Sequence, residues 1–326
     1  MTILFLGTGD IGLPSLRYLL SDDSTHTLLG VVTQPDKPVG RRGTPQAPAV
    51  KALALDHNVP VLQPEKIRDP ETLDHIRSLN PDLILVVAYG QLLPESLFKD
   101  IPNLACINLH ASLLPKHRGA APIQAALRDG DPETGITVMH ITKELDAGDM
   151  ILKKSLPIDP ADTAQSLHDK LADLAVPALA EALDCFAGGN APRTPQPHAN
   201  ATHTPKLSKA DGHIDWTLPA DQIERLIRAY HPWPGTFTTW INPDTQKPLS
   251  LKIFPPTHVA NPQSLEGRAP ALPPPGQIVA ASPDGITIAT GTTPLTITAL
   301  QAEGRKKLPA PDFLRGTPLN PGQQLR

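Results

Sequence analysis

Apolar and polar positions change period repeatedly along the first half of the chain. Continuous apolar or β-branched runs, which are typical of strands buried on both faces, occupy residues 3–6, 27–33, 83–88, 104–109, 136–141 and 150–158. Segments with helical spacing or helix-start residues lie between them, at residues 14–20, 47–57, 70–79 and 121–127. This alternation predicts a doubly wound, mostly parallel α/β sheet.

A longer helix is predicted at residues 163–186, where Leu167, Leu171, Leu174 and Leu179 fall on one stripe. Asp162 or Thr163 can cap its start, and the glycines at 188 and 189 can end it. The chain that follows, residues 191–205, has no periodicity and is rich in Pro, Thr and Asn. We interpret it as an interdomain linker.

Beyond the linker the pattern changes to short β-like runs after one amphipathic helix at residues 221–230. The runs occupy residues 236–241, 249–253, 277–281, 286–290 and 295–300. Short strands separated by turn residues predict a small β-barrel. Residues 255–275 are proline-rich and are predicted to be a surface insertion between strands. The predicted organisation is a first domain at 1–189, a linker at 190–207 and a second domain at 208–326.

Length and composition agree with a globular protein of two domains. The chain has 326 residues, of which 40% are hydrophobic and 19% charged. No apolar window is long enough to span a membrane, and the first residues lack the features of a signal peptide. Two cysteines in no metal or redox spacing fit a reducing cytosol. We therefore expect a cytoplasmic protein, and nothing in the sequence demands more than a monomer.

The charge distribution differs between the two halves. Residues 201–326 carry 12 Lys and Arg against 9 Asp and Glu, whereas residues 1–200 carry 17 against 24. A mildly basic C-terminal part permits a local anion-binding face, such as one for nucleic acid. Ordinary variation of surface charge explains the same numbers equally well.

A glycine-rich turn follows the first predicted strand, with the sequence Gly7-Thr8-Gly9-Asp10-Ile11-Gly12. This pattern occurs in dinucleotide-binding loops, but those need an acidic residue at the end of the second strand to bind a ribose. The second strand here ends in Val32-Thr33-Gln34-Pro35. The sequence therefore favours a tight turn before a helix over NAD binding.

The strongest chemical pattern is an Asn-x-His pair that ends the apolar run at 104–109. Asn108 and His110 are two residues apart, so they project to one side of a strand. They lie toward its carboxyl end, where ligands bind in open α/β sheets. Asp146 lies in a turn with Ala147 and Gly148, which allow close backbone approach. An amide, an imidazole and a carboxylate together can stabilise an oxyanion and transfer a proton, which predicts acyl transfer. The spacing of the histidines supports no zinc site, so no metal is expected.

Residues 104–151 closely resemble methionyl-tRNA formyltransferases, within the wider group of formyltetrahydrofolate-dependent formyltransferases. The matching segments are Asn108-Leu109-His110, Ser112-Leu113-Leu114-Pro115, Arg118-Gly119-Ala120-Ala121-Pro122-Ile123-Gln124 and Leu145-Asp146-Ala147-Gly148-Asp149. The resemblance implies a Rossmann-like formyltransferase domain followed by an OB-like β-barrel. It implies that Asn108, His110 and Asp146 form the catalytic triad. It also implies that Ser112, Leu113, Leu114 and Pro115 are the folate-binding signature, with 10-formyltetrahydrofolate as co-substrate.

Other segments resemble the tRNA-acting family in particular. Thr33-Gln34-Pro35-Asp36 followed by Gly40-Arg41-Arg42-Gly43 is similar to the loop that meets the tRNA acceptor end. Lys206-Leu207-Ser208-Lys209, Ile214-Asp215-Trp216 and Pro232-Trp233-Pro234-Gly235 are similar to the family's linker and C-terminal domain. The resemblance implies that initiator methionyl-tRNA is the partner and that Arg41, Arg42 and Lys206 contact it. Gly43 and Thr44 stand where the family often has two lysines.

Other functions stay open at this point. A formyltransferase that acts on the amine of a sugar nucleotide would use the same three catalytic residues. A folate hydrolase is a further relative, which would release free formate without any acceptor. A protein that only binds tRNA could also keep this fold, but the intact Asn108, His110 and Asp146 favour an enzyme over it.

Overall fold

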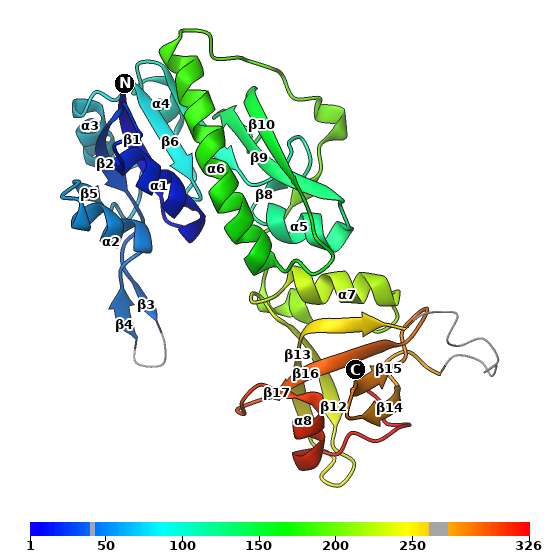
Figure 1. Ribbon diagram of the computed structural model, residues 1–326. Helices are drawn as coiled ribbons and strands as arrows, with labels where there is room; N and C mark the ends of the chain where they lie inside the picture. The colour runs from blue at the N-terminus through cyan, green and yellow to red at the C-terminus, as the bar shows by residue number, and fades with distance from the viewer. Residues whose placement is uncertain (40–42, 261–272) are drawn as a thin grey trace. The chain divides into compact units, whose positions relative to one another are not determined.

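The computed structural model describes residues 1–39, 43–260 and 273–326. The described chain divides into two compact units (Figure 1). The first contains Met1–Pro122, Glu133–Pro157 and His168–Thr204, and the second contains Ile123–Pro132, Ile158–Leu167 and Pro205–Arg326. Within the described parts of the chain, none of the helices combines the length and apolar character needed to cross a membrane.

The first unit is built on a seven-stranded sheet of order β10-β9-β7-β6-β1-β2-β5. The parallel strands are β1 (Thr2–Gly7), β2 (Thr27–Val32), β5 (Val61–Leu62), β6 (Leu83–Val87) and β7 (Ala105–His110). The predicted mostly parallel sheet is thus confirmed. Its edge is antiparallel, formed by β9 (Glu133–His140) and β10 (Met150–Pro157). The connection at 141–149 is too short for the crossover that a parallel pair requires.

Helices of the first half accompany this sheet, namely α1 (Leu13–Leu20), α2 (Ala49–Asp56), α3 (Pro70–Ser78) and α4 (Glu95–Lys99) (Figure 1). The predicted long helix is α6 (Ala164–Ala187). Leu167, Leu171 and Leu179 of its predicted stripe are buried, and Leu174 is half-buried. Thr163 begins it, because its hydroxyl accepts a hydrogen bond from the Ser166 amide at 3.3 Å. Gly189 ends it with φ of 68°, a left-handed conformation that suits glycine.

The glycine-rich turn is held by the sheet. The amides of Thr8 and Gly9 donate to the carbonyl of Ala88 at 3.3 and 3.2 Å. The Thr8 hydroxyl donates to the carbonyl of Tyr89 at 3.0 Å. Because these amides are already bonded within the protein, they do not form the free cradle that a dinucleotide phosphate needs.

Two short strand pairs were not predicted from the sequence. In the first, β3 (Lys37–Val39) pairs antiparallel with β4 (Thr44–Gln46). In the second, β8 (Arg118–Gly119) pairs in parallel with β11 (His203–Thr204). Strands of two or three residues are too short to show a period of two, so the sequence gives no signal for them.

The second unit contains an antiparallel sheet of order β12-β13-β16-β15-β14, with β17 beside β16. The strands are β12 (Thr236–Ile241), β13 (Pro248–Val259), β14 (Ile278–Ser282), β15 (Gly285–Ile288), β16 (Leu295–Ala302) and β17 (Leu308–Pro309). Its helices are α5 (Pro122–Asp129), most of which belongs here, α7 (Ala220–Ala229) and α8 (Ala310–Gly316). The β-rich second part is therefore confirmed. A complete β-barrel, as predicted, would have strands paired in a closed ring. Among the described residues the strand order of this sheet is open.

The C-terminal tail bonds to both ends of this open sheet. The backbone of Arg326 exchanges hydrogen bonds with Thr239 of β12 at 2.7 and 2.8 Å. The Leu325 amide donates to the carbonyl of Gly276, just before β14, at 2.8 Å. These bonds satisfy edge groups that an open sheet would otherwise leave exposed.

The proline-rich insertion predicted at 255–275 is wrong at its start. β13 continues through Pro255 and Pro256 to Val259, and Thr257 pairs with Ile297 of β16. The register shifts between Phe254 and Thr257, so the two prolines, which lack backbone donors, lie at an irregularity of the ladder. Residues 261–272 lie outside the described residues.

Asp82 anchors the start of β1 and makes a pH-dependent contribution to stability. Its carboxylate accepts a hydrogen bond from the Thr2 amide at 2.7 Å and one from the Asn103 side chain at 3.2 Å. These bonds, the first above all, lower the pKa of the carboxyl below its ordinary value. Stability from this group is complete above the unfolded pKa of about 4 and is lost as pH falls through the lower folded pKa.

Replacing Asp82 with asparagine is expected to lower the melting temperature at neutral pH by no more than about 2 °C, because the carboxylate is partly exposed. The difference from wild type should shrink at acid pH, as the native carboxyl also becomes protonated. Calorimetry at several pH values measures both effects. Asp74→Asn, on an exposed helical face, is the matched control, and an equal shift in both variants would contradict the prediction.

Candidate active site

Strand β7 presents the Asn-x-His pair as predicted. Asn108 pairs with Met139 of β9, and His110 pairs with Thr137 of the same strand. Because alternate residues of a strand share a face, both polar side chains leave β7 on one side. His110 is buried and Asn108 is half-buried.

Asp146 is brought to His110 by the turn between β9 and β10. The Asp146 Oδ2 atom lies 3.7 Å from His110 Nδ1, and both side chains are largely buried. The same oxygen accepts a hydrogen bond from the backbone amide of Gly119 at 2.8 Å. Asp146 has φ of 50°, a conformation that costs a non-glycine residue about 1–3 kcal/mol. The structure therefore brings His110 and Asp146 together at the end of β7, the strand that also carries Asn108.

The turn approaches β9 so closely that only glycine fits at position 148. A Cβ atom there would lie 1.8 Å from the carbonyl oxygen of His140. The Asp149 carbonyl accepts a hydrogen bond from the His140 amide at 2.9 Å. This close approach is what brings Asp146 back over the end of β7.

The His110 ring has an acceptor on each side. Its Nε2 atom lies 2.9 Å from the carbonyl oxygen of His117, and Nδ1 faces Asp146. A carbonyl only accepts, so Nε2 carries the proton in that contact. Nδ1 is then the ring nitrogen that can exchange a proton with a group beside Asp146.

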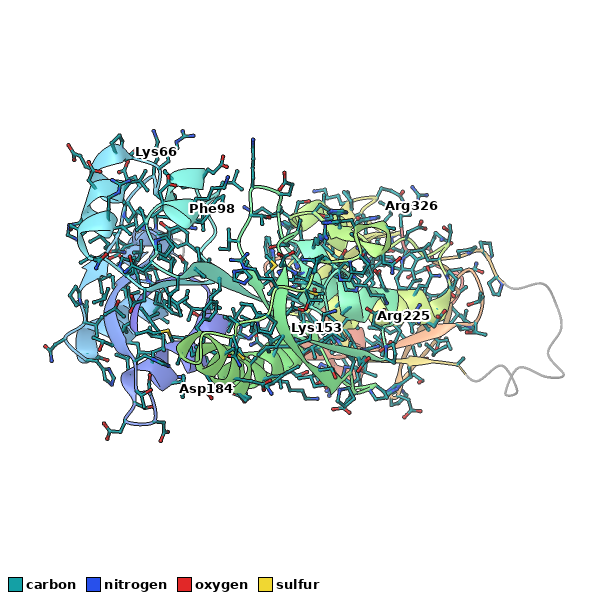
Figure 2. The ribbon with its side chains drawn as sticks, turned by 90° about the horizontal axis from the view of Figure 1, so that it is seen from above. Lys66, Phe98, Lys153, Asp184, Arg225 and Arg326 are labelled. Atoms are coloured by element: carbon teal, nitrogen blue, oxygen red, sulfur yellow. The ribbon has the colours of Figure 1, made fainter. Side chains whose placement is uncertain are left out.

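The predicted folate signature forms a tightly bonded loop after β7. The Ser112 hydroxyl donates to the Lys116 carbonyl at 2.6 Å, and the Ser112 carbonyl accepts from the Thr137 hydroxyl at 2.6 Å. Lys153 of β10, labelled in Figure 2, donates through its ammonium group to the Leu114 carbonyl. Ser112 and Leu114 are buried, whereas Leu113 and Pro115 are half-buried. The first two can therefore act on a ligand only through the backbone that they stabilise.

A groove beside the catalytic turn was not predicted from the sequence. It has a volume of about 820 Å³ and is lined by parts of α4, β7, the turn at 142–149 and the segment after α6. Apolar side chains in it include Phe98, labelled in Figure 2, together with Leu104 and Ile141. Ala147 and Gly148, the residues after Asp146, also line it. Charged side chains, among them Lys143 and Arg193, line it as well. The groove therefore offers both apolar and polar contacts to a small molecule.

Cys106 also lines this groove, but its thiol is not suited to nucleophilic catalysis. It is buried, and burial raises the pKa of the thiol above its ordinary value. The thiolate is the reactive form, so at neutral pH Cys106 is held protonated. Cys106 is therefore not expected to act as a nucleophile at this site.

Brief treatment with iodoacetamide at about pH 7.5 is expected to label Cys185 well before Cys106, because Cys185 is half-buried and Cys106 is enclosed. Peptide mass spectrometry at several times measures the two rates. Equal labelling of the two cysteines in folded protein would contradict this assignment.

The residues predicted to contact tRNA lie outside the catalytic strand and turn. Arg41 and Arg42 lie outside the described residues, between β3 and β4. Lys206 is exposed. In the second unit, Lys209 and Lys252 line a groove of about 440 Å³ together with Phe237 and Gln301. Lys252 could not be predicted from the sequence, because an isolated lysine in a strand has no distinguishing pattern.

No group of three or more His, Cys, Asp or Glu side chains within residues 1–39, 43–260 and 273–326 is arranged to hold a metal ion.

Comparisons with known proteins match both the α/β unit and the antiparallel β unit. A family model for formyl transferases matches residues 1–183, and one for the formyl transferase C-terminal domain matches residues 206–318. The chain belongs to the formyl transferase family.

The relatives are more specific. The chain is 46% identical over 318 residues to the methionyl-tRNA formyltransferase of Akkermansia muciniphila, covering 98% of this chain and 97% of that protein. It is 44% identical over 325 residues to that of Geobacter metallireducens, covering 100% and 98%. A structure of HypX from Aquifex aeolicus in complex with tetrahydrofolic acid has the same fold, with a TM-score of 0.61 at 19% identity. That match covers 96% of this chain and 46% of HypX.

Proposed function

We propose that this protein transfers the formyl group of 10-formyltetrahydrofolate to the free amine of initiator methionyl-tRNA. The observation that carries the proposal is the convergence of His110 and Asp146, 3.7 Å apart, on the strand that holds Asn108. Relatives of nearly equal length that are methionyl-tRNA formyltransferases support the choice of acceptor. They favour it over the amine of a sugar nucleotide.

In the proposed reaction the neutral amine of methionine attacks the formyl carbon. A carbon–nitrogen bond forms, and negative charge develops on the former carbonyl oxygen of the tetrahedral intermediate. Asn108 donates a hydrogen bond to that oxygen. Protonated His110 donates a second one through Nδ1, because Nε2 already donates to the His117 carbonyl. A proton leaves the attacking nitrogen and reaches the folate N10 atom as the old carbon–nitrogen bond breaks, with Asp146 holding His110 for this transfer. The products are formylmethionyl-tRNA and tetrahydrofolate.

We place the folate ring system in the groove beside the catalytic turn. The apolar side chains of Phe98 and Ile141 suit the faces of a flat heterocycle. The polar residues Thr142, Lys143 and Glu144 line the same groove. The loop of Ser112, Leu113, Leu114 and Pro115 would shape the neighbouring wall, where the reacting groups meet.

Basic residues of both predicted domains are candidates for binding the tRNA. We propose that Arg41, Arg42 and Lys206 contact the tRNA and that the C-terminal domain at 208–326 contributes further phosphate contacts. Lys209 and Lys252 in the groove of the second unit suit that role. The catalytic domain would be residues 1–189, joined to the C-terminal domain through the linker at 190–207. We propose that the enzyme acts in the cytoplasm as a monomer.

A formylation assay with three acceptors tests the proposal. The purified protein and 10-formyltetrahydrofolate are incubated with initiator methionyl-tRNA, elongator methionyl-tRNA or an amino-sugar nucleotide. We expect transfer to the initiator tRNA by far the fastest. Preferential formylation of the sugar nucleotide would overturn the proposed acceptor, and release of free formate without any acceptor would indicate a hydrolase.

A further inference from the structure

The segment predicted as a linker makes ordered contacts on both sides of the catalytic turn. Thr194 exchanges backbone hydrogen bonds with Met150, the first residue of β10, at 2.8 and 3.0 Å. Nine residues later, β11 pairs with Arg118 and Gly119 of β8. Gly119 is the residue whose amide holds the Asp146 carboxylate. The segment at 194–204 therefore connects the two strands between which Asp146 is positioned.

Gln196 is the residue of this segment that reaches the turn itself. It is 3% exposed. Its Nε2 atom donates to the backbone carbonyls of Asp146 at 2.9 Å and Gly148 at 2.8 Å. Its Oε1 atom accepts from Arg118, whose Nε and terminal nitrogen lie at 3.1 and 2.7 Å. All hydrogen-bonding positions of the buried amide are thus occupied.

The orientation of this amide is determined by its partners. The guanidinium group of Arg118 can only donate, so the atom facing it must be the amide oxygen. The two turn carbonyls can only accept, so the atom facing them must be the amide nitrogen. A reversed side chain would place donors against donors and acceptors against acceptors in a buried site. Only glutamine, with one donor group and one acceptor, satisfies both sides with this side-chain length.

We propose that Gln196 is a positioning residue for formyl transfer, which holds the turn at 144–149 so that the Asp146 carboxylate stays against His110. This proposal rests on the proposed function for its kinetic consequences. Asp146 adopts a left-handed conformation that a non-glycine residue keeps only where surrounding contacts enforce it. The Gly119 amide fixes its side chain, and Gln196 fixes its backbone on the other side. Gln196 itself does not touch the reacting atoms, so it acts only through the position of Asp146.

Gln196→Glu separates the two halves of this contact. The glutamate keeps an acceptor for Arg118 and adds a charge that attracts it, but it loses the donor that holds the two carbonyls. We expect the variant to remain folded while kcat falls about ten- to a hundredfold, because a small displacement of a catalytic group has a large effect on rate. The KM values for tRNA and folate should stay within about twofold. Thr194→Val keeps the backbone bridge and is the matched control on the same segment, with activity expected near wild type.

A double-mutant cycle with Asp146→Asn shows whether Gln196 acts through Asp146. If it does, adding Gln196→Glu to Asp146→Asn should change kcat by less than about twofold, since the group being positioned is already lost. A full further decrease in the double variant would show an independent effect and overturn the proposal. An unchanged kcat in Gln196→Glu would also overturn it.

Hydrogen exchange provides a readout that does not depend on the acceptor or on activity. Amides at 144–149 should exchange faster in Gln196→Glu than in wild type, while those of the distant strand β2 stay unchanged. If the wild-type protein transferred no formyl group, the proposed function would be wrong, but the exchange measurement would still test the role of Gln196. If both Gln196→Glu and the isosteric Gln196→Met lose their native melting transition, Gln196 is a residue of global stability and the proposal fails.

Discussion

Replacing Asp146 with asparagine is expected to lower kcat by about a hundred- to ten-thousandfold, the range associated with acid–base groups. Asparagine has nearly the same shape and can still accept the hydrogen bond from the Gly119 amide, which lies 2.8 Å from the native carboxylate. It cannot carry the charge that faces His110. The loss therefore measures the charge of Asp146, with little contribution from altered packing. Single-turnover formylation at saturating substrates is the measurement.

Two comparisons make this result interpretable. Asp74→Asn removes a carboxylate from an exposed helix, where it pairs with Arg77, and should leave kcat within about twofold of wild type. The melting temperature of Asp146→Asn should also stay close to wild type. Near-native turnover in Asp146→Asn would remove Asp146 from the chemistry.

Replacing Asn108 with alanine is expected to lower kcat by about a hundred- to a thousandfold, corresponding to about 2.7–4 kcal/mol for one oxyanion donor. Among the described residues, no hydrogen bond involves the Asn108 side chain, so its amide is available to a substrate. The same fact predicts a small effect on stability, because no internal partner is left unsatisfied. Rapid-quench kinetics and a melting curve together separate the two effects.

Asn108→Asp provides a sharper contrast at this position. Aspartate matches the size of asparagine but replaces the donor with a negative charge, which repels the developing oxyanion. We expect it to be no more active than the alanine variant. If Asn108→Asp retained most of the wild-type rate, oxyanion stabilisation by this side chain would be ruled out.

The predictable part of the site came from local periodicity and from resemblance. A strand alternates its faces every second residue, so Asn108 and His110 could be placed on one side without knowledge of the fold. The groove could not be predicted, because its walls come from α4, β7, the catalytic turn and the chain after α6. The burial of Ser112 and Leu114 could not be predicted from the sequence either, since their backbone is held by Thr137 of a later strand.

The sequence by itself determined the order and type of the main elements, because the spacing of apolar residues reflects contacts that each strand or helix must bury. It also determined which side chains could carry the chemistry. Only the tertiary structure decided how they are held: Gln196 binds Arg118, 78 residues earlier, and the Asp146 carbonyl, 50 residues earlier. Such contacts leave no periodic signal, because they depend on where the folded chain returns, and a single glutamine in a segment without pattern reveals nothing of its partners.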